Sequence, residues 1–161
     1  MIKKLDNALL QDLQQQAAKS NRKRSHYNLH EQLSDPVNRL CISLSKGTYI
    51  RPHRHQQKWE LILALKGEIC VLIFNDDGGV VDTFILSPEG EVCAFEMPAN
   101  TWHTLYPVTE VAAFFEVKPG PFEPTPEKDF AQWAPKEGEH NVDAFLQWMQ
   151  TAQKGDSFFY G

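Results

Sequence analysis

The sequence has little of what marks a secreted or membrane-bound protein. Its three cysteines, Cys41, Cys70 and Cys93, are too few and too scattered for a disulfide framework. Each lies in an apolar, strand-like run, so we expect three buried free thiols in a reducing compartment. No run approaches the roughly 20 apolar residues that span a bilayer, and residues 1–6 begin no signal peptide. These absences predict a cytoplasmic protein without a membrane partner.

Positive charge is also scarce. The chain has 16 Lys and Arg residues against 21 Asp and Glu residues, and its net charge is −5. This balance argues against a nucleic-acid partner, because phosphate recognition needs a basic face. The 161 residues, with 42% hydrophobic and 23% charged side chains, predict one globular domain with its own core.

From residue 39 onwards, short apolar runs are separated by turn residues. Residues 75–79 read Asn-Asp-Asp-Gly-Gly and form a strong hairpin signal. Many short strands with frequent turns predict an all-β sandwich or jelly roll. The expected strands are Leu40–Leu44, Tyr49–His55, Glu60–Leu65, Ile69–Phe74, Val80–Leu86, Val92–Met97, His103–Tyr106 and Val111–Val117.

Helical patterns flank these runs on both sides. Residues 5–17 carry an apolar residue at every fourth position, which predicts an N-terminal α-helix that Asp6 or Asn7 can cap. An apolar stripe also follows Asn141, and it predicts a last α-helix that ends near Gly155.

The segment between the barrel and the last helix is rich in proline. Residues 118–140 hold five of the ten prolines, which excludes a helix or a central strand and predicts an ordered arm. We therefore divide the single domain, residues 1–161, into three parts. They are an N-terminal helix and arm (1–38), a β-barrel core (39–117), and a Pro-rich arm with the C-terminal helix (118–161).

The candidate metal ligands begin with His53 and His55. Two histidines one residue apart on a strand project to the same face. Glu60 has the opposite parity and can join them only if the chain turns within residues 56–58. Two imidazoles and a carboxylate make most of a divalent-metal site, with His103 as the candidate fourth ligand. A lone histidine is more often a hydrogen-bonded core or surface residue, but four ligand-type residues together favour one site.

These residues carry a resemblance to a known family. The spacing of Gly47, His53, His55, Glu60 and Gly67 resembles the first motif of the cupin superfamily at every position. Residues 90–103 resemble its second motif, although Asn100 stands where the family usually has Gly and Pro107 where Asn often follows. With residues 22–30 and 115–122, the whole chain resembles the WbuC-type cupin metalloproteins. That family is associated with bacterial O-antigen gene clusters and has no assigned reaction.

The resemblance implies a specific fold and a metal cofactor. The implied fold is the cupin double-stranded β-helix, a jelly-roll barrel, with flanking N- and C-terminal α-helices. The implied cofactor is one divalent transition metal held by His53, His55, Glu60 and His103. Three neutral imidazoles and one carboxylate give a centre of charge +1 with open positions. Fe, Mn, Ni, Co and Zn all suit such a site, and affinity order does not choose among them.

Four further residues are candidates for substrate binding. Tyr49 and Arg51 share parity with His53 and His55, so a continuous strand would aim both into the barrel. Arg51 would then anchor a carboxylate or phosphate, or alternatively pair with Glu96 or another barrel carboxylate. His26 and His30 follow a basic cluster at residues 19–24. This cluster is either a solvated helix exit or an arm that recruits anions to a pocket mouth.

Three functions fit these features. The first is a metal-dependent isomerase, epimerase or lyase acting on a sugar or small organic acid in surface polysaccharide (O-antigen) metabolism. The alternatives are an Fe(II)-dependent dioxygenase and a non-catalytic module that binds a small molecule. In each case we expect a ligand that is anionic or sugar-like.

We also expect a homodimer. If Glu60, Ile62 and Ala64 face the barrel interior, the leucines between them lie outside. Such an apolar face must be covered by the terminal helices or by a second subunit. Cupins commonly dimerise through such a sheet, which favours a second copy of the chain.

Overall fold

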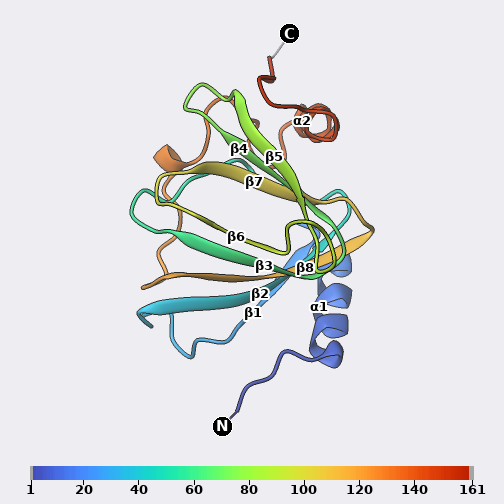
Figure 1. Cartoon of the computed structure of the whole chain (residues 1–161), viewed down its shortest axis with the longest axis vertical. Coiled ribbons are helices and arrows are strands. Elements are labelled where there is room, and N and C mark those ends of the chain that lie inside the picture. The colour runs from blue at the N-terminus through green and yellow to red at the C-terminus, as the bar shows by residue number, and fades with distance from the viewer. Residues whose placement is uncertain (1, 160–161) are drawn as a thin grey trace.

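The structure is a computed structural model that describes residues 2–159. In chain order the elements are α1 (Asn7–Lys19), β1 (Arg24–Asn28), β2 (Val37–Ser45), β3 (Glu60–Lys66), β4 (Ile69–Phe74), β5 (Val80–Leu86), β6 (Ala94–Met97), β7 (Trp102–Pro107), β8 (Val111–Pro119), a short 3₁₀ helix (Glu127–Asp129) and α2 (Val142–Met149). The strands form two antiparallel sheets, one in the order β1-β2-β8-β3-β6 and one in the order β5-β4-β7. Figure 1 shows the two sheets facing each other, which confirms the predicted jelly-roll architecture.

Most of the predicted strands are present. β4 and β5 have the predicted bounds, and the other five predicted strands that are present, β2, β3, β6, β7 and β8, differ from prediction by at most three residues at either end. The expected strand Tyr49–His55 is wrong, because only His53 forms isolated bridges there, with His103 and Phe130. Pro52 interrupts this run, since proline has no N–H group to donate to a strand partner.

β1 is a strand that the sequence pattern does not reveal. Its residues, Arg-Ser-His-Tyr-Asn, have no apolar alternation, so nothing in them predicts burial of one face. The strand forms because it pairs along the edge of β2, with Tyr27 opposite Cys41. This pairing brings the basic N-terminal segment, including His26, alongside the barrel.

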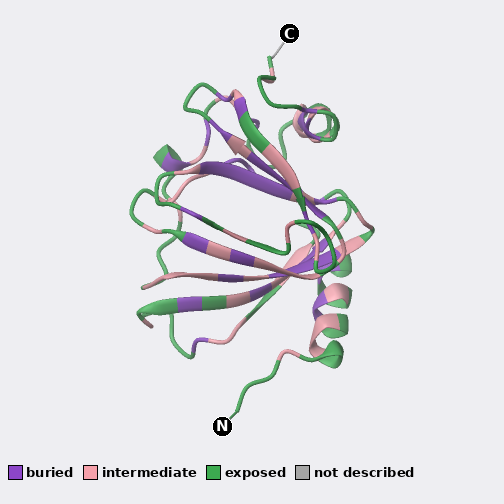
Figure 2. Ribbon diagram, viewed as in Figure 1, coloured by how far each residue is buried: buried purple, intermediate pink, exposed green. Residues whose placement is uncertain are grey.

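The core lies between the sheets and continues outside the smaller one. Alternate residues of β4, Ile69 and Val71, pack inside the barrel. The residues between them pack with Phe145 and Met149 of α2. α2 therefore covers the outer face of the three-stranded sheet, as Figure 1 shows. Figure 2 shows β4 and β7 largely buried, whereas the edge strand β5 is partly exposed. Double coverage explains why β4 is apolar on both faces.

The terminal helices form as predicted, with one change in length. The Asp6 side chain accepts a hydrogen bond from the Leu9 N–H and caps α1. Leu13 of α1 is buried, and its carbonyl accepts a hydrogen bond from Ser25 in β1. α2 ends at Met149 rather than near Gly155, and the chain then continues in turns.

The cysteines follow the prediction in two cases out of three. All three are free thiols; Cys41 and Cys70 are buried, whereas Cys93 is exposed. Burial raises the pKa of the Cys41 thiol to about 11. Cys93 directly precedes β6, whose first residue, Ala94, is exposed as well. Within residues 2–159, no helix has the length and apolar character needed to cross a bilayer.

Candidate metal centre

The backbone places His53 and His103 next to each other. The His53 N–H donates to the His103 carbonyl at 3.0 Å, and the His103 N–H donates to the His53 carbonyl at 2.9 Å. Their ring centroids lie 4.5 Å apart. His55 follows, and its carbonyl accepts a hydrogen bond from the N–H of Asn100, which has a φ of 68°. Asn tolerates this left-handed conformation better than most residues, so it can replace the glycine of the motif.

Glu60 completes the cluster as the first residue of β3. The chain turns at residues 56–57, as the parity of Glu60 required, and the Glu60 side chain is only 2% exposed. Its Oε2 atom lies 3.1 Å from His103 Nε2, and its Oε1 atom lies 3.4 Å from His55 Nε2. The structure thus gathers the four predicted ligands into one group.

Hydrogen bonds fix how two of the imidazoles are oriented. His53 Nδ1 lies 3.0 Å from the Arg51 carbonyl, and His103 Nδ1 lies 2.9 Å from the Thr101 carbonyl. A carbonyl only accepts, so each Nδ1 carries a proton and, in the neutral ring, Nε2 carries the lone pair. Such bonds hold a metal-binding histidine in the correct tautomer. His55 Nε2 is buried without a hydrogen-bond partner, which is costly unless a ligand satisfies it.

The separations of these atoms suit a shared metal ion. Among residues 2–159, no group of three or more His, Cys, Asp or Glu side chains is placed, as it stands, to hold a metal ion, and Glu60 contacts His103 directly. A metal ion would have to replace this direct contact. With metal–ligand bonds of about 2.1 Å, neighbouring ligands lie about 3.0 Å apart in an octahedron and about 3.4 Å apart in a tetrahedron. The Glu60–His103 and Glu60–His55 distances of 3.1 and 3.4 Å fall in this range. The donor set therefore fits a divalent transition metal.

The charges in the group are strongly coupled. Burial, with His103 nearby, lowers the pKa of His53 to about 3, so this ring is neutral at physiological pH. Burial favours protonation of Glu60, but the His103 and His55 rings beside it hold its pKa well below the usual value. Burial disfavours a charged His103, yet the Glu60 carboxylate raises the pKa of this ring overall. Without a metal, Glu60 and His103 therefore favour an ion pair.

Lys118, at the end of β8, is a site residue that the sequence reasoning missed. Its Nζ atom lies 3.2 Å from Glu60 Oε1 and 2.6 Å from Glu116 Oε1. Burial would lower the pKa of this ammonium group, but the two carboxylates raise it. The alternation of side chains along β8 could have identified Lys118 from the sequence. Phe114, Glu116 and Lys118 share one face of this strand, and its other face is apolar. Two charged residues on an inward face indicate a site.

Two cavities meet at this cluster. The larger, of about 530 Å³, is lined by His53 and His103 and also by His26 and His30 of the N-terminal arm. Lys118 lines both cavities.

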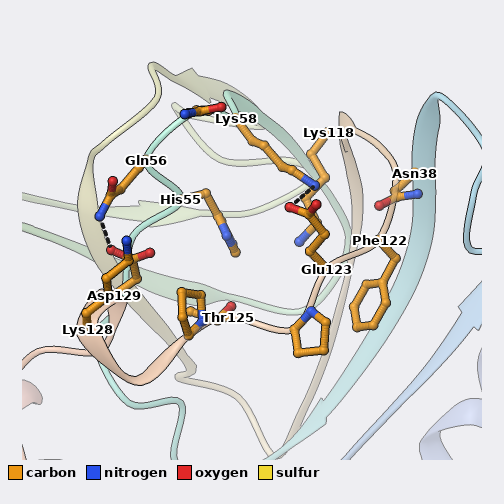
Figure 3. A pocket seen from close by; sticks show the side chains of 13 residues that line it. Asn38, His55, Gln56, Lys58, Lys118, Phe122, Glu123, Thr125, Lys128 and Asp129 are labelled. Atoms are coloured by element: carbon orange, nitrogen blue, oxygen red, sulfur yellow. Dashed lines mark hydrogen bonds and ion pairs between the residues drawn. The ribbon is translucent and has the colours of Figure 1, made fainter.

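The smaller cavity, of about 300 Å³, is lined largely by polar side chains. Figure 3 shows the His55 ring pointing into this cavity, between Lys118 on one side and Asp129 on the opposite side. Gln56 donates a hydrogen bond to Asp129 at 2.6 Å. The cluster of His53, His55, Glu60 and His103 is therefore bordered by two cavities of different chemical character.

The other two predicted substrate residues lie elsewhere. Tyr49 is buried, donates a hydrogen bond to the Pro135 carbonyl at 2.7 Å, and lines neither cavity. Arg51 is also buried, and it donates to the Ala131 carbonyl and pairs with Glu127. The carboxylate partner of Arg51 is thus in the Pro-rich arm and is not Glu96. Because residues 49–52 are not a strand, parity with His53 does not aim these side chains into the barrel.

Comparisons with known proteins identify the fold. The model of a family described as a domain of unknown function, DUF6016, matches residues 5–86. KdgF from Halomonas sp. is 16% identical, with a TM-score of 0.51 over 65% of this chain and 85% of that one. The cupin domain of Cnp3 from Schizosaccharomyces pombe is 11% identical, with a TM-score of 0.50 over 63% of this chain and 69% of that one.

A third similar structure is CapF, solved with the inhibitor 3-isopropenyl-tropolone. It is 14% identical, with a TM-score of 0.56 over 66% of this chain and 30% of that one. A search of curated proteins gave no match. At these identities the structural likeness shows the fold alone, and the cupin double-stranded β-helix predicted from the sequence is confirmed.

Proposed function

The chain belongs to the DUF6016 family, and we propose that it is a metal-dependent cupin enzyme acting on a sugar or small organic acid by isomerase, epimerase or lyase chemistry. The observation that carries this proposal is the contact of Glu60, a buried carboxylate, with His103 and His55 at ligand-to-ligand distances. A buried carboxylate with several imidazoles around it is costly for a purely structural role, because each ion must be removed from water.

In this proposal His53, His55, Glu60 and His103 hold one divalent ion. Such an ion supplies Lewis-acid catalysis by polarising a carbonyl or hydroxyl oxygen. The Nδ1 hydrogen bonds of His53 and His103 keep the two rings fixed for this task. The cavity that reaches His53 and His103 admits a small molecule. His26 and His30 also line it, and His30 is buried and accepts a hydrogen bond from the Arg39 N–H.

Other features support the setting of this function. The resemblance of residues 22–30 and 115–122 to WbuC-type cupins favours a role in bacterial O-antigen metabolism. Free thiols at all three cysteines support the reducing cytoplasm as the compartment. A second copy of the chain against β3 is the proposed partner.

The test is elemental analysis of untagged protein purified anaerobically without chelator. One equivalent of manganese, nickel, cobalt or zinc supports the proposal. One equivalent of iron with oxygen consumption favours a dioxygenase instead. Absence of metal even after reconstitution would overturn the proposal and favour a non-catalytic binding module.

The ligand assignment has its own test. The double substitution His55→Ala and His103→Ala should abolish metal binding while the protein still unfolds cooperatively. His140→Ala is a matched control, because His140 is an exposed histidine outside both cavities. Stoichiometric metal in the double variant would show that these residues are not ligands.

A further inference from the structure

The larger cavity combines an apolar body with a charged inner end. Eight of its eighteen lining residues are leucine, isoleucine or phenylalanine. Ile62, Leu105 and Phe114 belong to the barrel core and are at most 4% exposed, so the cavity reaches deep between the sheets. Its volume of about 530 Å³ lies within the roughly 300–1,000 Å³ typical of small-molecule sites.

We propose that this cavity binds a monocarboxylate with an apolar body, an aryl- or branched alkyl-substituted acid, whose carboxylate lies beside Lys118 and whose body packs against β2 and β8. The proposal deepens the proposed function, and it rests on that function because the carboxylate would lie next to the metal ligands. It selects the organic acid over the sugar as the substrate class.

Strand register arranges the apolar and charged groups in successive rows. Ile42 of β2 lies opposite Phe114 of β8, and Leu40 of β2 lies opposite Glu116 of β8. Lys118 follows two residues later on the same face. The lining thus changes along β8 from the apolar side chain of Phe114 to the charged side chains of Glu116 and Lys118. A ligand lying along β8 meets apolar side chains at one end and the ammonium group of Lys118 at the other.

The charges around Lys118 favour one added negative charge when a metal is bound. Lys118 makes ion pairs with Glu60 and Glu116, and with neutral imidazoles these three groups carry one net negative charge. A divalent ion would change this to one net positive charge, which a monocarboxylate neutralises. The ammonium group has three N–H donors, and two are used by Glu60 and Glu116. One donor is available for the ligand.

A sugar is a poor fit to the same walls. Each sugar hydroxyl needs a hydrogen-bond partner when it is buried, and an unpaired one costs roughly 1–3 kcal/mol. The side chains Leu40, Ile42, Ile62, Leu105 and Phe114 offer none, and the polar lining side chains such as Ser25 and Asn28 come from β1 and not from this apolar wall. The smaller cavity is more polar, but it lacks an apolar body and does not reach His53 or His103.

The experiment is titration calorimetry on the metal-loaded protein with four probes that vary one feature each. They are 3-phenylpropanoate, propanoate without the ring, 3-phenylpropan-1-ol without the charge, and gluconate with hydroxyls in place of the apolar body. We expect 3-phenylpropanoate to bind tightest and propanoate to bind roughly 100-fold more weakly, as loss of a buried ring implies. Gluconate should show no saturable binding. Tighter binding of gluconate or equal binding of the alcohol would overturn the inference.

Matched variants locate the bound molecule. Lys118→Met should weaken 3-phenylpropanoate binding at least tenfold, whereas Lys128→Met, in the wall of the smaller cavity only, should not. Leu40→Asn keeps the side-chain shape but removes the apolar surface, and it should also weaken binding at least tenfold. Unchanged affinity in both Lys118→Met and Leu40→Asn would overturn the inference. Because titration of wild-type protein needs no variant, misfolding of one variant does not decide the result.

Metal content separates the two proposals. Protein that takes up one equivalent of metal but prefers gluconate contradicts the apolar carboxylate and leaves the proposed function intact. Protein that takes up no metal contradicts the proposed function whatever the probes show.

Discussion

At the scale of single residues, the group around Glu60 combines a structural role with the candidate chemistry. Glu60 is almost fully buried and pairs with Lys118 and, without metal, with His103. Such an ion pair is strongly destabilising to break, because the remaining charge stays buried without its partner. Removing one member of this buried group should therefore destabilise the barrel even in metal-free protein.

Glu60→Gln tests this dual role. We expect the metal-free variant to lose about 3 kcal/mol of unfolding free energy, measured by urea denaturation, because the buried cations lose a carboxylate partner. Glu110→Gln is the control. Glu110 pairs with Lys46 on the surface, and its loss should cost at most about 1 kcal/mol. Equal costs in the two variants would show that the buried pair contributes no more than an exposed one.

Residue spacing was enough to predict which side chains gather at the candidate centre, but not all that surround it. His53, His55, Glu60 and His103 were predicted as one group, and the structure places them together. Alternation along β8 marks Lys118 as an inward charge, but it does not identify Glu60, 58 positions away, as its partner. The pairing of β8 with β3 brings the two together. A local sequence pattern does not predict which charged residues from distant parts of the chain form an ion pair.

At the scale of elements, Arg51 anchors the Pro-rich arm to the barrel. It donates two hydrogen bonds to the Ala131 carbonyl, at 3.1 and 2.7 Å, and pairs with Glu127 in the 3₁₀ helix. Proline-rich segments form few backbone hydrogen bonds of their own, so side chains must hold them in place. The sequence analysis assigned Arg51 to the substrate site because it shares strand parity with His53 and His55. That parity does not apply, because the backbone around Arg51 is not part of a strand.

Arg51→Met should therefore destabilise the arm and leave ligand binding unchanged. We expect a loss of about 2 kcal/mol in unfolding free energy, because a buried carbonyl loses a charged donor. Limited proteolysis should cut residues 121–135 faster in the variant. Arg39→Met, which removes a partly exposed arginine 3.9 Å from Asp35, is the control. A large loss of affinity for 3-phenylpropanoate in Arg51→Met would support the substrate role predicted from the sequence instead.

A second link joins the start of β1 to the C-terminal segment. Arg22 and Arg24 both pair with Glu137, at 2.6 and 2.7 Å. The basic cluster that follows α1 is thus partly a structural clamp, and its Arg22 and Arg24 also line the larger cavity. Burial acts to raise the pKa of Glu137, but hydrogen bonds from Arg22 and Arg24 outweigh it and lower the pKa below 4.5.

The pH dependence of this clamp follows from the direction of that shift. A carboxyl group with a lowered pKa in the folded state stabilises the fold fully above its unfolded pKa, near 4.5. This stabilisation is lost as the pH falls through the lower folded pKa. The difference in unfolding free energy between wild type and Glu137→Gln should therefore be constant from pH 7 to about 5 and shrink in more acidic solution. A difference that does not change down to pH 3 would contradict the clamp.

At the scale of the whole molecule, the architecture was predictable because the core is periodic. Turn signals and short apolar runs gave the bounds of β4 and β5, and the motif spacing gave the cupin barrel. The edge strand β1 was not predictable, since its residues show no alternation and it depends on β2 for its pairing. The shapes of the two cavities also depend on chain segments far apart in sequence.

The way the helices cover the sheets leaves one apolar surface for a partner. α2 covers the outer face of the three-stranded sheet, and α1 packs against β1 and β2. Within residues 2–159, neither helix packs along β3, which meets α1 at its end, where Lys66 donates a hydrogen bond to Gln14. Leu63 on the outer side of β3 lies opposite Phe115 of β8, and both are half-buried. Adjacent apolar side chains on one open sheet face are a common dimer surface.

Leu63→Lys tests whether a second copy of the chain covers this surface. We expect wild-type protein to sediment as a dimer and Leu63→Lys as a monomer, because a buried ammonium group without a partner prevents association. Val81→Lys is the control, because Val81 is an exposed valine on β5, at the edge of the other sheet. Circular dichroism should show that both variants keep the barrel. A wild-type monomer, or a Leu63→Lys variant that stays dimeric, would show that no second subunit covers the outer side of β3.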